Sequence, residues 1–137
     1  TIEVKTTLDG PALKQAEEAA KKLADEVFAG VDFGFQPLCA AFGFEGGFDG
    51  GEQQQKGAEW LAENAKHLFD ICVAGKYSWA NVGGKGWTLG TDASSVCDET
   101  KRFIALLLDN TRTHAQERFR YFVGEGHWDW LSAYIRG

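Results

Sequence analysis

The sequence predicts a mainly α-helical fold, a helical hairpin extended to a three- or four-helix bundle. Apolar residues recur at spacings of three and four residues over 11–29 and again over 52–74. A third helical pattern begins near Asp92 to Ser95 and continues to Gly124. We therefore expect one helical domain over residues 1–137, with an ordered Gly/Phe loop and a possible small β-hairpin as its only non-helical parts.

The first two predicted helices carry the same kind of apolar seam, which is typical of helices that pack side by side. The first, over 11–29, follows Asp9-Gly10 and has proline in its first turn, where proline is tolerated. Residues 1–8 alternate loosely and are expected to form a short strand or an extended arm. The two seams consist of Leu13, Ala16, Ala20, Leu23 and Val27, and of Ala58, Leu61, Ala65, Leu68 and Cys72.

Between these helices, residues 30–51 alternate glycine with phenylalanine. A loop kept only for connection is usually short and polar, so this segment is expected to be ordered and is a candidate functional surface. A turn of helix after Pro37 is an alternative for part of it. The rings either fold inward as core or form an exposed patch or pocket lip. The candidate binding residues here are Phe33, Phe35, Phe42, Phe44 and Phe48.

Residues 76–92 predict a hairpin or an ordered loop. Tyr77 and Trp79 alternate on one side of Gly83-Gly84, and Trp87 and Leu89 alternate on the other. Trp79 and Trp87 are added to the candidate binding residues. The aromatic tail over 127–135 is expected to dock back as a short helix.

Composition limits the partners and the compartment. The formal net charge is −6, which disfavours nucleic acid as a partner. Apolar runs are too short to insert in a membrane. Cys39, Cys72 and Cys97 are odd in number and lack metal-binding spacing, so reduced thiols are expected. The predicted location is cytoplasmic, or outside the cell by export without a cleaved signal peptide.

No catalytic motif is recognised, so an enzyme is not the favoured interpretation. Glu63 and His67 have a spacing that could hold a metal, but no second cluster repeats it, and neither a metal nor a cofactor is expected. His114, and His127 with Asp129, are interpreted as surface polar groups. Heme or another flat ligand among the aromatic residues is an alternative.

The seamed helices and the acidic balance resemble the WXG100-like proteins of type VII secretion. That resemblance implies a helical hairpin that dimerises, and an export motif formed by Tyr121 with Glu125 four residues later. The chain departs from the family in three ways: the Trp-x-Gly turn is absent, the link between the helices is long, and a third long helix is present.

The predicted function is non-enzymatic protein–protein binding, with a separate protein or a second copy as the partner. The protein is either secretion-associated or of the immunity or antitoxin type, in which an acidic face neutralises a basic toxin. A small hydrophobic ligand or heme in an aromatic pocket is the alternative function, and an enzyme of unknown class is a further one.

Overall fold

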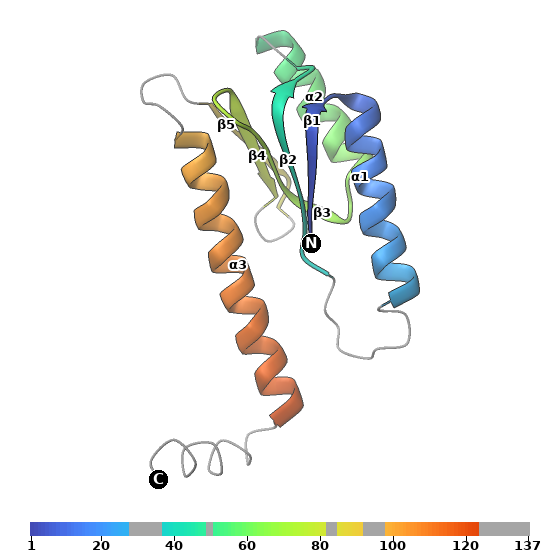
Figure 1. Cartoon of the computed structure of the whole chain (residues 1–137), viewed down its shortest axis with the longest axis vertical. Coiled ribbons are helices and arrows are strands. Elements are labelled where there is room, and N and C mark those ends of the chain that lie inside the picture. Colours follow the sequence, from blue (N-terminus) through green and yellow to red (C-terminus); the bar gives the residue numbers. More distant parts are fainter. Residues whose placement is uncertain (28–36, 49–50, 82–84, 92–97, 124–137) are drawn as a thin grey trace.

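A computed structural model describes residues 1–27, 37–48, 51–81, 85–91 and 98–123. It shows an α/β fold, in which three α-helices pack on a five-stranded mixed sheet (Figure 1). The predicted helical bundle is therefore wrong. In chain order the elements are β1 (Ile2–Leu8), α1 (Gly10–Lys22) continued by the π-turn η1 (Leu23–Val27), β2 (Cys39–Gly46), α2 (Gly51–Asn64), β3 (Leu68–Val73), β4 (Tyr77–Asn81), β5 (Trp87–Thr91) and α3 (Asp98–Val123).

The strands lie in the sheet in the order in which they occur in the chain. β1, β2 and β3 are parallel, because α1 and α2 carry the chain back between them. β4 and β5 then return antiparallel, with Gly75 at a φ of 75° in the tight turn that joins β3 to β4. β1 is therefore an edge strand, paired with β2 alone among the described residues.

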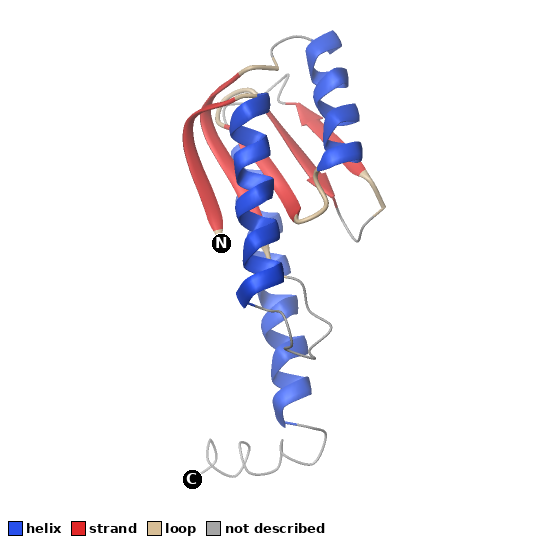
Figure 2. Ribbon diagram, turned by 90° about the vertical axis from the view of Figure 1, so that its right-hand side faces the viewer, coloured by secondary structure: helices blue, strands red, loops and turns tan. Residues whose placement is uncertain are grey.

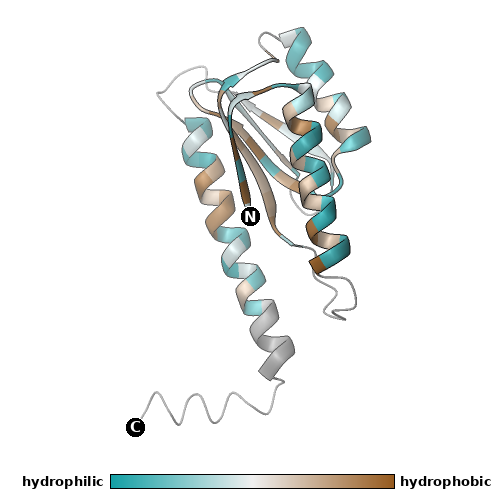
Figure 3. Ribbon diagram, turned by 45° about the vertical axis from the view of Figure 1, so that its right-hand side comes forward, coloured by the Kyte–Doolittle hydropathy of each residue, from teal (hydrophilic) through white to brown (hydrophobic). Residues whose placement is uncertain are grey.

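The helices divide unequally between the two faces of the sheet. α1 and α2 cover one face, which we call the closed face (Figure 2). α3 lies on the other, which we call the open face, and packs there against β3 and β4. Figure 3 shows α3 continuing beyond the ends of the strands, past the level of the N-terminus. Of the described helices, α3 alone packs on this face of the five-stranded sheet.

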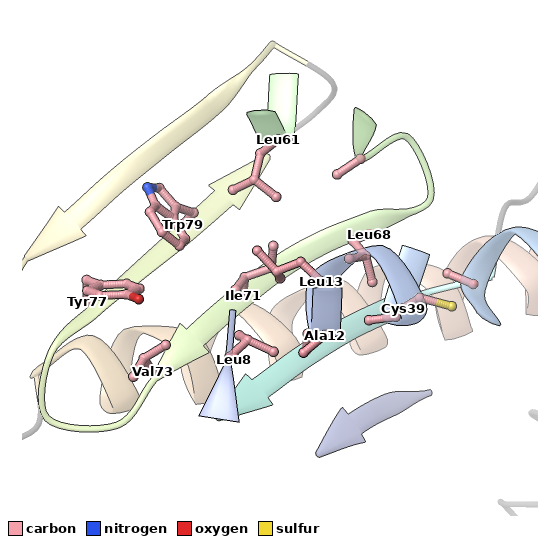
Figure 4. Packing of buried hydrophobic residues seen from close by; sticks show 14 residues of the cluster. Leu8, Ala12, Leu13, Cys39, Leu61, Leu68, Ile71, Val73, Tyr77 and Trp79 are labelled. Carbon is pink, nitrogen blue, oxygen red and sulfur yellow. The ribbon is translucent and has the colours of Figure 1, made fainter. Parts of the chain in front are cut away.

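The main core lies on the closed face (Figure 4). Leu13 of α1 and Leu61 of α2 pack on Ile71, Tyr77 and Trp79 of the sheet, and all five side chains are fully buried. α1 begins where Asp9 accepts a hydrogen bond from the N–H of Ala12, at 2.9 Å. A smaller cluster on the open face joins Ala40 and Cys72 to Phe103 of α3.

The second predicted helix, over 52–74, differs most from the structure. The helix ends at Asn64, and the rest of the predicted seam belongs to β3. β3 is buried on both faces, with Ile71 on the closed face and Cys72 on the open face. A strand of this kind is an almost continuous apolar run, in which helical spacing occurs by chance.

The prediction for the Gly/Phe segment, residues 30–51, is also replaced in part by a strand. β2 occupies its middle, so the residues after Pro37 form a strand and neither a loop nor a helical turn. β4 and β5 form the antiparallel pair expected from the alternation over 76–92, but they belong to the main sheet. The helical hairpin implied by the WXG100 resemblance is absent from the described residues.

Candidate protein-binding surface

Those predicted aromatic residues that the structure describes do not converge on one pocket. Phe42 and Phe44 point to the open face, where the Phe42 ring lies 5.6 Å from Phe103 and 5.5 Å from Phe44. Phe48 instead packs against Trp79, at 5.8 Å, on the closed face. Trp79 is wholly buried and belongs to the core.

The other predicted site residues give no site that the structure describes. Trp87 is half-buried against the main core. Phe33, Phe35 and Glu125 lie outside the described residues, and the Tyr121 side chain is not described. The aromatic pocket is therefore not formed by the described members of the set, and the export motif stays a prediction.

An apolar strip crosses the uncovered part of the open face. Ile2 and Val4 of β1 lie beside Ala40 and Phe42 of β2, and neighbours in register share a face. Phe44 follows Phe42 two residues later on the same face. We call Ile2, Val4, Phe42 and Phe44 the open strip. The side chains of Ile2, Val4 and Phe44 are 43%, 58% and 61% exposed, whereas Phe42 is partly buried against Phe103.

One side of α3 faces this strip. Thr111 and Ala115 line a cleft of about 590 Å³ together with Thr1 and Leu38, so their side of α3 points toward β1. Ile104 and Leu108 lie on that same side, because helical residues three or four apart are neighbours. Their side chains are 49% and 64% exposed. We call these two residues the α3 flank.

Polar side chains are buried between the sheet and the first two turns of α3. Asp70 of β3 and Ser78 of β4 are inaccessible to solvent, and neither side chain has a hydrogen-bond partner among the described residues. Burial raises the pKa of Asp70 to about 7, although the N–H of Ile71 and the charge of Arg102 partly oppose this rise.

Arg102 reaches this polar cluster over a glycine. A side-chain carbon at Gly90 would overlap the Arg102 guanidinium and lie 3.2 Å from the Ser78 hydroxyl, so glycine leaves the space that the guanidinium occupies. Glu99, one turn earlier, accepts a 2.6 Å hydrogen bond from the N–H of Gly75. Burial opposes ionisation of Glu99, but this bond and that from Thr100 together lower its pKa. Glu99 thereby ties the start of α3 to the β3–β4 turn.

A third buried carboxylate lies on the closed face. Glu17 of α1 accepts hydrogen bonds from the N–H groups of residues 66–68 and contacts Nδ1 of His67 at 2.6 Å. It fixes the connection between α2 and β3. The partner of His67 is therefore Glu17, not the Glu63 considered from the spacing. No group of three potential metal ligands occurs within the described part of the chain.

Only part of this surface could be predicted from the sequence. Loose alternation at Ile2 and Val4 indicated a strand, but not which face it would leave exposed. The burial of Asp70 and the contacts of Arg102 and Glu17 were not predicted, since the residues around each of them are distant in the chain. Cys39 and Cys72 are buried and are not in disulfides, while Cys97 is outside the described residues. Burial raises the pKa of the Cys39 thiol, which disfavours a nucleophilic role.

Comparison with known proteins identifies no relative. The chain matches no family model, no curated protein and no solved structure. Among the helices that the structure describes, none has the length and apolar character needed to cross a bilayer.

Proposed function

We propose that this protein acts by binding another protein through the open strip and the α3 flank. The observation that carries the proposal is the gathering of exposed apolar side chains on one side of the fold, over β1, β2 and α3. Contiguous exposed apolar surface of this kind is unusual unless a partner covers it.

The composition of the surface supports a protein as the ligand. Phe44, Val4 and Leu108 are bulky apolar groups, and α3 also carries the exposed ion pairs Asp98–Lys101 and Asp109–Arg112. An apolar centre with a polar rim is the usual anatomy of a protein interface. The cleft at Thr1 and Leu38 continues this surface at its lower end.

The buried polar cluster is a weaker basis for a function. Asp70 has the raised pKa that many catalytic groups show. However, the side chain is inaccessible to solvent, and none of the described pockets includes it. We therefore assign this cluster to the packing of α3.

Site-specific photo-cross-linking tests the proposal. A photoreactive residue replaces Val4 in one variant and Leu89 in a control, because Leu89 is an exposed aliphatic residue on the closed face. In cells that make the protein, we expect one partner to be cross-linked from position 4 and not from position 89.

The purified partner is then titrated by calorimetry. We expect Val4→Glu to weaken binding at least about tenfold, since a charge would be buried in an apolar interface, and Leu89→Gln to bind as the wild type does. Equal cross-linking from both positions, or full affinity in Val4→Glu, would show that the open strip is not the binding surface.

A further inference from the structure

We propose that α3 is a pH-sensitive flap, which leaves the sheet as a unit when Asp70 ionises while the closed-face core stays folded. This opening is a property of the chain by itself, whether or not a partner binds the open strip. Two features of the interface between α3 and the sheet support it: α3 shares little apolar core with the rest of the fold, and a buried carboxyl group lies beneath it.

α3 is attached to the rest of the fold by a small apolar interface. The main core lies on the other side of the sheet (Figure 1), and none of its described side chains comes from α3. Among the described side chains of α3, Phe103 and Glu99 are the buried ones. Phe103 packs in a cluster with only two other buried residues, Ala40 and Cys72. Segments with few buried apolar contacts open independently of the main core, so α3 can leave the sheet without unfolding it.

The strands around Asp70 surround its carboxyl group with uncharged residues. Asp70 lies on the open face of β3, between Ala40 of β2 and Ala80 of β4 in the sheet register. Ser78 shares that face of β4 and is paired with Gly90 of β5. On this face, the described residues of β2, β4 and β5 beside Asp70 therefore offer no charge that would stabilise its ionised form.

The charged groups that reach this cluster come from α3. Arg102 is the positive one, and its charge partly opposes the rise in the pKa of Asp70. Glu99 is the negative one: although burial opposes its ionisation, hydrogen bonds lower its pKa, so its charge is constant above about pH 5. β3 itself adds Cys72, whose sulfur lies 3.9 Å from the Thr100 hydroxyl. Asp70 is thus the carboxyl group whose charge can change here between pH 5 and pH 8.

Buried polar atoms in this interface lack partners while α3 is docked. Both carboxyl oxygens of Asp70, the Ser78 hydroxyl and one oxygen of Glu99 have no hydrogen-bond partner among the described residues. Each such atom costs free energy that water would return if α3 moved away. Ionisation of Asp70 adds the cost of a buried charge, and for this reason burial raises its pKa to about 7.

The direction of the pH dependence follows from the state of Asp70 in the two forms. When α3 leaves, water reaches Asp70 and its pKa returns to the usual value near 4. Between about pH 4 and pH 7, the docked form therefore holds a proton that the open form has released. Docking weakens by up to about tenfold per pH unit as the pH rises through this window, and does not change further above it. Opening would join the apolar residues beneath α3 to Phe42 of the open strip.

Hydrogen exchange of the full chain, measured by mass spectrometry, tests this opening. Protection factors, corrected for the intrinsic exchange rate at each pH, are compared between amides 102–110 of α3 and amides 13–20 of α1. The α1 amides report opening of the closed-face core. An undocked helix protects its amides little, because packing provides most helical stability in proteins. We expect α3 to be at least about tenfold less protected than α1 at pH 8, and its protection to fall by roughly tenfold to a hundredfold from pH 5 to pH 8.

Three variants assign the pH dependence to its source. Asp70→Asn cannot ionise, so its α3 protection should change by less than about threefold over the same range. His114→Gln removes the histidine of α3, a residue type that ordinarily titrates between pH 5 and pH 8, and should keep the wild-type profile. Phe103→Ala removes the buried ring of the interface, so it should lower α3 protection at both pH values and keep the fall with pH.

Equal protection of α1 and α3 at pH 8 would show that α3 opens only with the whole fold, and would overturn the flap. Unchanged α3 protection in Phe103→Ala would have the same meaning. A flat wild-type profile, or a fall that Asp70→Asn keeps or His114→Gln loses, would overturn Asp70 as the trigger. If Asp70→Asn does not fold, the wild type and His114→Gln decide the question. None of these outcomes bears on partner binding by the open strip, because no partner is present.

Discussion

The two faces of the sheet differ in how completely helices cover them. On the closed face, two helices cover the strands, and Tyr77, Trp79 and Ile71 are fully buried. On the open face, α3 packs mainly on β3 and β4, polar side chains lie beneath it, and Phe44 is mostly exposed. The difference indicates that the closed face provides most of the folding free energy, while the open face is available for interaction.

The largest expected effect tests the closed face. Trp79→Ala removes a wholly buried indole that contacts Tyr77 at 4.6 Å and Phe48, and Gly57 of α2 is close-packed against it. We expect it to lower the free energy of unfolding by about 3–5 kcal/mol, measured by urea denaturation. Ile104→Ala, an exposed aliphatic position on α3, is the control and should change it by less than about 0.5 kcal/mol. Similar losses for both would contradict the division between the faces.

A smaller change in stability, which depends on pH, tests the buried polar cluster on the open face. The pKa of Asp70 is raised to about 7, so between about pH 4 and pH 7 the folded chain holds a proton that the unfolded chain has released. Stability should therefore fall as the pH rises through this window. Asp70→Asn cannot ionise, and should be more stable than the wild type by roughly 2–4 kcal/mol at pH 8 and nearly equal to it at pH 4.

The measurement is thermal or urea unfolding at both pH values, with Asp109→Asn as the control. Asp109 has an exposed side chain paired with Arg112. A difference between wild type and Asp70→Asn that does not change with pH would mean that Asp70 is ionised in the fold, held by Arg102.

The smallest effects compare two phenylalanines only four residues apart. Phe48 packs on Trp79 and Phe44 is exposed on the opposite face, so changing both together would mix two causes. We expect Phe48→Ser alone to cost about 1–3 kcal/mol and Phe44→Ser less than about 0.5 kcal/mol by urea denaturation. Phe44→Ser should instead weaken partner binding. If it destabilises the chain as much as Phe48→Ser does, the open strip is core rather than interface.

Local features of the chain were readable from the sequence. The segments containing α1 and α3 were predicted as helices from the spacing of their apolar residues and from the residues at their ends. Such patterns can be read locally, because an amphipathic helix repeats them within a single segment of the chain. The alternation at Tyr77, Trp79, Trp87 and Leu89 likewise indicated the strands that became β4 and β5. The Gly/Phe segment was correctly expected to be more than a connecting loop, although β2 within it was missed.

Only the tertiary structure decided the fold class and the surface. The apolar run from Leu68 to Val73 suits a helix or a strand buried on both faces, and pairing with β2 and β4 selects the strand. Phe44 and Phe48 look alike in the sequence, but one is exposed and the other packs on Trp79, because Phe44 lies within β2 and Phe48 follows the end of that strand at Gly46. Exposure depends on which helix covers which strand, and that arrangement is set by contacts between residues far apart in the chain.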